Sequence, residues 1–450
     1  MSASAAEPGS LPRAPGSGYR VWLLVLLMLV YTSNFVDRSI LGVLAPAIKR
    51  ELHLSDTQIG MLGGLAFAVF YTVLGVPLAR LAERRSRVLL MTACIAVWSA
   101  MTAVCGLAQS FVQLALARTG VGVGEAGCLP AAQSLISDHF PPSRRATALA
   151  VFSLGIPLGS LIGAVAGGWI AQHLSWRQAF FLVGLPGLVL AVLTPLTLRE
   201  PARGQSDAGG AQPDKAPPLS AVIATLWRKP GVLWVCAGAS VSASGTYGVG
   251  TFLASYFVRR FHLDLTHAGL MAGLVSGLPM LLSNMLGGVA ADRLARSDRR
   301  GYAWTAAAGL VLAAPLFIAG FLQTSVVAAA VLLGVGGVFQ QVYLAPTFAV
   351  ANNAVSARMR ASSVALLALV WNLVGLGFGP VIVGAVSDAM GRSLGAGGAD
   401  PLRLCLGAGG ACANAPAAGL IYGLLVISLG YAAGAALFLV SARTLRRDLA

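Results

Sequence analysis

Long apolar runs constrain this 450-residue chain more than any other feature of its sequence. Roughly a dozen stretches hold about 20 or more mainly apolar residues, the length that a helix needs to cross a hydrocarbon core of about 30 Å. Only 10% of the residues are charged, against about 25% in a soluble domain. Runs such as 21–30 and 306–321 are apolar on every side, whereas the strands of a β-barrel alternate between polar and apolar residues. The sequence therefore predicts an all-α polytopic membrane protein, not a soluble enzyme.

The breaks between the apolar runs predict 12 transmembrane helices in two sets of six. If the N-terminus is cytoplasmic, the cytoplasmic segments hold 22 Lys and Arg residues and the segments on the other side hold 7. The positive-inside rule then places both termini in the cytoplasm, and we expect the inner (plasma) membrane of a bacterium. The expected spans lie near 20–48, 56–82, 88–109, 111–139, 145–173, 176–198, 230–260, 266–295, 303–322, 326–355, 358–391 and 417–441.

The two sets of spans predict two six-helix bundles, 19–198 and 230–441, joined by a cytoplasmic linker. Residues 79–87 and 288–293 place a small residue, an acid and a base at equivalent turns of the two bundles, which indicates an internal repeat. The linker, 199–229, is rich in Gly and Pro and contains a possible interfacial helix. We expect residues 1–18 to be a disordered cytoplasmic segment and residues 442–450 to be a cytoplasmic tail.

Four ionisable residues fall deep inside predicted spans of the first bundle: Asp37, Arg38, Arg118 and Glu125. A charge at the bilayer centre costs about 2.5–3.5 kcal/mol on insertion scales, so each one indicates a partner or a function. Arg118 and Glu125 are two helical turns apart and share a face, whereas the adjacent Asp37 and Arg38 point about 100° apart. A buried ion-pair network that only fixes packing is the structural alternative.

Glu125 is the expected proton-titrating group, with Asp37 as an alternative or a second site. A buried carboxylate needs a counter-charge, which Arg118 or Arg38 could supply. An anionic substrate that drew the arginine away would favour protonation of Glu125 and so couple the proton to the substrate.

The predicted interior of the second bundle has no clear charge near mid-span and contains neutral polar residues, among them Gln340, Tyr343 and Asn372. An ionic wall that faces a neutral, partly aromatic wall suits an amphipathic ligand with a charged head. Cys405 and Cys412 share one outward-facing loop, so a disulfide between them is possible. The basic charge follows the loops, which argues against nucleic-acid binding, and we expect no metal site.

Several motifs resemble the major facilitator superfamily, and the first bundle resembles its spinster branch, which transports sphingolipids and lysolipids. The resemblance rests on the acid-base turns, on residues 34–38, on Arg118 with residues 120–126, and on residues 138–141. It implies that Asp37 and Glu125 serve ion coupling and that Arg38 and Arg118 bind the substrate head group. Tyr31 and Asn34, on the same helix, are further candidates for the substrate site. The resemblance also implies that Glu83, Arg84, Asp292 and Arg293 form a cytoplasmic gate.

The sequence thus predicts a proton-coupled secondary transporter that works by alternating access. Its expected partners are the lipid bilayer, protons and an amphipathic or anionic small molecule, lysolipid-like by resemblance. We expect a monomer that uses the proton gradient and no cofactor. A drug or organic-acid exporter is one alternative, and a membrane receptor that binds ligand without transporting it is another.

Overall fold

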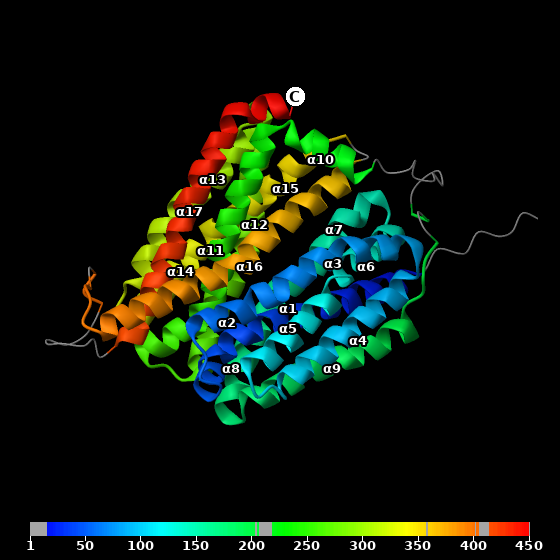
Figure 1. Cartoon of the computed structure of the whole chain (residues 1–450). Helices are drawn as coiled ribbons and strands as arrows, with labels where there is room; N and C mark the ends of the chain where they lie inside the picture. The colour runs from blue at the N-terminus through cyan, green and yellow to red at the C-terminus, as the bar shows by residue number, and fades with distance from the viewer. Residues whose placement is uncertain are drawn as a thin grey trace, which may run out of the picture.

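The structure is a computed structural model that describes residues 16–202, 205–206, 218–356, 359–400, 402–404 and 414–449. Within these residues all regular secondary structure is helical. The helices form two bundles that lie side by side, one coloured blue to green and the other green to red in Figure 1. The prediction of an all-α membrane protein built from two helical halves is confirmed.

The first half contains the helices that precede the linker. Its central helix, α1, passes along α8, α9 and α11. The helices of this half are α1 (Ser17–Glu51), α2 (Asp56–Gly63), α3 (Leu65–Arg84), α4 (Arg87–Cys105), α5 (Phe111–Glu125), α6 (Cys128–His139), α7 (Pro142–Ser153), α8 (Gly155–His173) and α9 (Trp176–Thr197).

The second half begins with a short helix, α10, that lies beside α11 and α16 at one end of the bundle. The helices of this half are α10 (Leu219–Trp227), α11 (Pro230–Phe261), α12 (Leu265–Ser297), α13 (Gly301–Phe321), α14 (Val326–Gln340), the 3-10 turn η1 (Gln341–Tyr343), α15 (Leu344–Asn353), α16 (Arg360–Gly395) and α17 (Ala415–Asp448).

Eleven helical segments of the described chain are long and apolar enough to cross a membrane. The remaining predicted span, 111–139, is divided between α5 and α6, which meet at Ala126 and Gly127 and are each shorter than a membrane-spanning helix. The observed helices agree with the predicted spans to within a few residues at most ends. The main difference is α17, which continues to Asp448, so most of the segment expected as a tail is helical.

Serine residues define several helix starts. The side chains of Ser55, Ser86, Ser110, Ser175 and Ser325 each accept a hydrogen bond from the backbone N–H three residues later. Such caps satisfy donors that an α-helix leaves unpaired in its first turn. The short connections between spans are therefore fixed by local sequence.

The two halves pack mainly along four helix pairs, α8 with α12, α2 with α16, α1 with α11, and α3 with α16. Glycine permits the closest approach. A Cβ atom at Gly64 would lie only 2.5 Å from the backbone oxygen of Gly377 on α16. Small residues at helix contacts let backbones approach within membranes.

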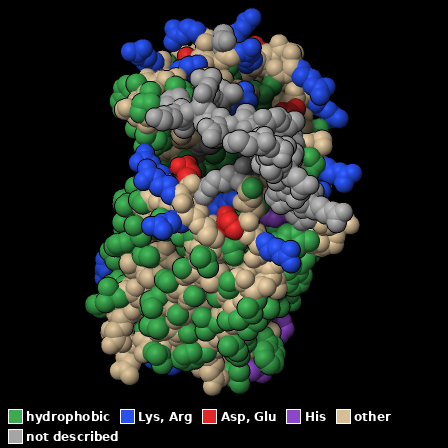
Figure 2. All heavy atoms as spheres, turned by 90° about the vertical axis from the view of Figure 1, so that its right-hand side faces the viewer, with side chains coloured by type: hydrophobic (Ala, Val, Ile, Leu, Met, Phe, Trp, Pro, Cys, Tyr) green, Lys and Arg blue, Asp and Glu red, His purple; other side chains and the backbone are tan. Residues whose placement is uncertain are grey.

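Basic side chains gather at the end of the molecule that carries α10 and the end of α17. Figure 2 shows this distribution: Lys and Arg (blue) cluster over the upper part of the face, while hydrophobic side chains (green) cover the lower part. Glu83, Arg84, Asp292 and Arg293 are exposed at the same end. We call this the basic end of the molecule.

Candidate functional site

Two buried ion pairs join α1 to α5 in a crossed arrangement. The Arg38 Nε atom lies 2.7 Å from Glu125 Oε2, and Arg118 Nη1 lies 3.4 Å from Asp37 Oδ1. Asp37, Arg118 and Glu125 are each no more than 2% exposed. The adjacent residues Asp37 and Arg38 thus reach different partners, although all four charges lie on two helices. Of the two arginines considered as counter-charge for Glu125, the structure selects Arg38.

Asp37 has a second partner on a third helix. The Thr102 hydroxyl on α4 donates to Asp37 Oδ2 at 2.5 Å and also lies 2.9 Å from the Trp98 carbonyl oxygen. The Asp37–Arg118 pair is therefore enclosed by α1, α4 and α5. No property of the sequence distinguished Thr102 from the other polar residues of the spans, so the sequence did not predict its role.

Aromatic rings surround the Arg38 guanidinium. Its Cζ atom lies 5.2 Å from the ring centre of Phe35, 4.9 Å from that of Phe67 and 4.5 Å from that of Tyr71. The Phe67 ring also lies 5.4 Å from Arg118 Cζ, so it contacts both arginines. Cation-π contacts of this kind stabilise a cation that has lost its water. The sequence did not predict these rings, because aromatic residues are common in any apolar helix.

Arg38 is the most accessible member of the group. Its side chain is 16% exposed, whereas that of Glu125 is fully buried. Two buried atoms of the group, Glu125 Oε1 and Arg118 Nε, have no hydrogen-bond partner among the described residues. An unpaired buried polar atom is costly, so the group retains unused capacity for a proton or a ligand.

The remaining first-half candidate residues lie on α1 beside this group. Asn34 is buried, and Tyr31 is partly buried. The Tyr31 ring stacks on Phe152 of α7 with centroids 4.4 Å apart. Asn34 and Tyr31 precede Arg38 on α1 by about one turn and two turns, respectively.

The neutral candidates of the second half are held mainly by their own bundle. Gln340 donates to Thr246 Oγ1 at 2.5 Å and to the Tyr431 hydroxyl at 3.0 Å. Tyr343 is buried, with its ring 6.2 Å from that of Phe438. A cavity of about 60 Å³ adjoins Gln340 between α11, α12, α13 and α14, which is enough for ordered water but not for an organic substrate.

Asn372 differs from Gln340 and Tyr343 because it pairs with a residue near the ionic group. Its Oδ1 atom accepts a hydrogen bond from the Tyr247 hydroxyl at 3.3 Å. Tyr247 lies within electrostatic range of Arg38 and Tyr71 of the first half. The structure thus places Tyr247 and Asn372 near the ionic group, whereas the contacts of Gln340 and Tyr343 lie within the second half.

A second charged cluster joins the two halves at the end of their interface that is opposite the basic end. The Asp56 carboxylate on α2 lies 2.6 Å and 2.7 Å from two Arg259 nitrogens on α11. Ser387 of α16 donates to Asp56 at 2.6 Å, and Lys49 lies 2.5 Å from it. Asp388 completes the cluster through bonds to α2. We call these residues, with Thr57, the inter-half lock.

The lock was not predicted. Its members occur near ends of spans, where charged residues are ordinary, and the residues that pair between the halves are separated by about 200 to 330 positions in the sequence. Only the packing of the two halves brings them together.

The predicted gate residues at the basic end are not brought together. Glu83, Arg84, Asp292 and Arg293 are exposed, and no ion pair between the two turns occurs in the described chain. Gate residues that pair when the basic end is closed would separate when the basic end opens.

The possible disulfide lies outside the structure's description, because Cys405 and Cys412 are not among the described residues.

A buried arginine anchors the linker at the basic end. Arg87 at the start of α4 bonds the carboxylates of Asp138 and Glu200, the latter at 2.7 Å, and the Pro201 carbonyl oxygen at 3.0 Å. The Glu200 carboxylate also accepts from the Val88 backbone N–H at 3.0 Å. The chain after α9 is thus held against α4 and α6.

The described residues contain no group of three or more His, Cys, Asp or Glu side chains arranged to hold a metal ion. In the ionic group of α1 and α5, each acid pairs with one arginine.

Comparisons with known proteins identify relatives over most of the chain. The sequence profile of the Major Facilitator Superfamily matches residues 27–380. An MFS-type efflux pump of Mycolicibacterium smegmatis is 36% identical, in an alignment covering 84% of this chain and 87% of the pump. Protein spinster homolog 1 of Bos taurus is 28% identical, with 84% of this chain and 74% of that protein covered.

A solved structure resembles the whole fold. It is a bacterial homologue of the human lysosomal transporter Spinster in an inward-facing and unoccupied conformation, with a TM-score of 0.85 and 31% identity. The match covers 96% of this chain and 99% of that protein.

Proposed function

The chain belongs to the major facilitator superfamily, and we propose that it is a proton-coupled secondary transporter of an amphipathic molecule with an anionic head. As a member of this superfamily it is an integral membrane transporter and not an enzyme. The observation that carries the proposal is the crossed pair of buried ion pairs, Arg38 with Glu125 and Arg118 with Asp37.

Competition for Arg38 would couple the proton to the substrate. Glu125 uses one oxygen for Arg38, and the other has no partner among the described residues. An anionic head group that bound the partly exposed Arg38 would leave Glu125 buried without a counter-charge. A carboxylate in that position is stabilised by taking up a proton. Proton uptake at Glu125 and anion binding at Arg38 would therefore favour one another.

The aromatic surroundings of Arg38 favour an amphipathic ligand. Phe35, Phe67 and Tyr71 provide apolar surface beside the cation, and Tyr247 with Asn372 provides a neutral polar surface from the other half. A ligand with an anionic head and an apolar body would match both surfaces. A lysolipid, the substrate class that the resemblance to the spinster branch implies, has this combination of head and body.

The direction of opening follows from the two ends of the interface. The inter-half lock holds the halves together at one end, while the gate residues at the basic end are exposed. We assign the basic end to the cytoplasm by the positive-inside rule, in the plasma membrane of a bacterium with both termini inside. The chain is then inward-facing, like the solved relative.

Transport into liposomes tests the proposal. The probe is labelled lysophosphatidylglycerol, an anionic amphipath, in vesicles with and without an imposed pH gradient. We expect gradient-driven movement that a protonophore abolishes, and counterflow without a gradient. Movement that responds to neither the imposed pH gradient nor the protonophore would refute proton coupling. Lysolipid binding without counterflow would support a non-transporting receptor instead.

Drug export is the second candidate, because the efflux pump of M. smegmatis is 36% identical over most of its length. Ethidium, a cationic aromatic probe, distinguishes the two functions in the same vesicles. Extrusion of ethidium with no movement of lysophosphatidylglycerol would favour the drug exporter. The buried acids Asp37 and Glu125 would then be the groups that a cation engages.

A further inference from the structure

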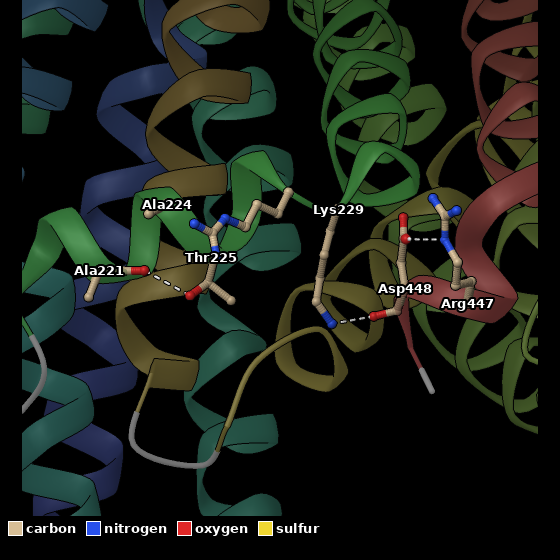
Figure 3. A pocket seen from close by; sticks show the side chains of 7 residues that line it. Ala221, Ala224, Thr225, Lys229, Arg447 and Asp448 are labelled. Atoms are coloured by element: carbon tan, nitrogen blue, oxygen red, sulfur yellow. Dashed lines mark hydrogen bonds and ion pairs between the residues drawn. The ribbon is translucent and has the colours of Figure 1, made fainter.

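A basic groove lies at the junction of α10, α11 and α17, on the second half and away from the ionic group. Its volume is about 520 Å³. Figure 3 shows Lys229 and Arg447 on opposite sides of Asp448, with Thr225 on the neighbouring helix α10. The lining residues are Ala221, Ala224, Thr225, Arg228, Lys229, Arg447 and Asp448.

Asp448 lines the groove and is held in place by two hydrogen bonds to the start of α11. Its carboxylate accepts a hydrogen bond from the Gly231 backbone N–H at 2.6 Å, and its backbone carbonyl accepts one from Lys229. Asp448 is 4% exposed. The last turn of α17 is thereby attached to the first turn of α11, and the Asp448 charge is occupied by the N-terminus of that helix.

The groove retains positive charge after this pairing. Three cations line it against one acid. The Arg447 side chain is 75% exposed, and its Nε atom is 3.8 Å from Asp448 Oδ1. Arg228 is exposed and has no ion-pair partner among the residues that the structure describes. Two guanidinium groups are therefore available to an anion at the mouth of the groove.

Helix α10, which forms one wall of the groove, also carries larger apolar side chains. Val222 and Leu226 are buried against the bundle, whereas Ile223 is 45% exposed and Trp227 is 74% exposed. Trp at the end of a short amphipathic helix is typical of the boundary between head groups and acyl chains. A ligand bound there would meet a basic surface and an apolar surface side by side, which is the chemistry of a phospholipid rather than of a soluble anion.

The geometry points to a binding site for an anionic phospholipid, with the basic side chains that line the groove, Arg228 and Arg447 among them, contacting the head group and Trp227 contacting the acyl region. The occupant is a bilayer lipid and not the transported molecule. This inference therefore does not depend on proton coupling at Glu125. Basic surfaces beside a helix end bind anionic head groups by this combination of charge and apolar contact.

Native mass spectrometry of the full-length protein tests the site. The purified protein is incubated with phosphatidylglycerol or phosphatidylcholine that carry the same acyl chains. We expect retention of phosphatidylglycerol over phosphatidylcholine. Each of Arg228→Gln and Arg447→Gln should lower the bound phosphatidylglycerol by about fivefold. Trp227→Ala should lower the binding of both lipids.

Arg360→Gln is the matched control, because Arg360 is an exposed arginine of the second half that does not line the groove. It should leave retention unchanged. Equal retention of phosphatidylglycerol by the wild type and the Arg228→Gln, Arg447→Gln double variant would overturn the proposal. Displacement of the lipid by millimolar inorganic phosphate, with no effect of Trp227→Ala, would overturn the lipid assignment in favour of a free-phosphate site. Because both arginines are exposed, size-exclusion profiles of the variants should match the wild type.

Discussion

The Asp388 carboxylate on α16 accepts hydrogen bonds from the backbone N–H groups of Asp56, at 2.9 Å, and Thr57, at 2.8 Å. These groups form the first turn of α2 in the other half of the molecule. Asp388 thus occupies the positive end of a helix to which it is not connected in sequence. The contact holds the two halves together at the end opposite the basic end. It must therefore break whenever the halves separate at the end that carries the lock.

Asp388→Asn should weaken the inter-half lock. The amide keeps the shape of the side chain but removes the charge that the α2 N-terminus and the Thr57 hydroxyl stabilise. We expect the closed arrangement of this end to lose about 1–2 kcal/mol. Spin labels at the exposed positions Arg50 and Arg392, in opposite halves, should then report a larger population of long distances.

Asp264→Asn is the control for the lock, because Asp264 is an acid at the same end that caps its own helix through His267. It should leave the distance distribution unchanged. If Asp388→Asn also left it unchanged, the lock would not contribute to the closed state.

The sequence predicted the fold well because membrane helices leave a strong signal. Each crossing must be long, apolar and bounded by breaks, so a run such as 176–198 predicts α9 (Trp176–Thr197) almost directly. The helical period also explains why Asp37 and Arg38 reach different partners. Those properties depend only on residues close together in the chain.

The partners of the charged residues could not be predicted in this way. Either Arg38 or Arg118 could have paired with Glu125, and only the packing of α1 against α5 selects Arg38. The contact between Asp388 and Asp56, which are 332 positions apart in the sequence, depends on the approach of the two halves. Packing decisions of this kind leave no local pattern in a single sequence.

Glu125→Gln should abolish proton-driven transport while preserving exchange. The amide can still occupy the site of the carboxylate beside Arg38, but it cannot take up a proton. We expect gradient-driven movement of lysophosphatidylglycerol to fall by about tenfold or more, which corresponds to about 1.4 kcal/mol. Counterflow at equal pH should remain within about threefold of the wild type. Initial rates in proteoliposomes measure both quantities.

Glu51→Gln serves as the control for proton coupling, because Glu51 forms an exposed ion pair with Arg177 outside the site. Its proton-driven rate should equal that of the wild type. Unchanged coupling in Glu125→Gln would transfer the proton-binding role to Asp37.

Arg118→Gln should destabilise the first half. It leaves Asp37 buried with only Thr102 as a partner, and breaking a buried ion pair on one side costs about 3–5 kcal/mol. Adding Asp37→Asn removes the unpaired charge and should restore most of the lost stability. Thermal unfolding in detergent measures both variants. A double variant as unstable as the sum of the two single variants would show that the pair does not act as a unit.

Glu200 should make the attachment of the linker sensitive to acid. Burial acts to raise the pKa of Glu200, but the hydrogen bonds from the Val88 backbone N–H, Arg87 and Ser86 together outweigh burial and lower it. A carboxyl with a lowered pKa contributes stability above its unfolded value of about 4.3 and loses that contribution as the pH falls further. The melting temperature of the wild type should therefore fall as the pH decreases below about 5.

Glu200→Gln should lower the melting temperature at pH 7 and flatten this decrease. Glu83→Gln, which changes an exposed carboxylate at the same end, should preserve the wild-type profile. Identical acid profiles for wild type and Glu200→Gln would mean that the bonds of Glu200 to α4 do not stabilise the fold.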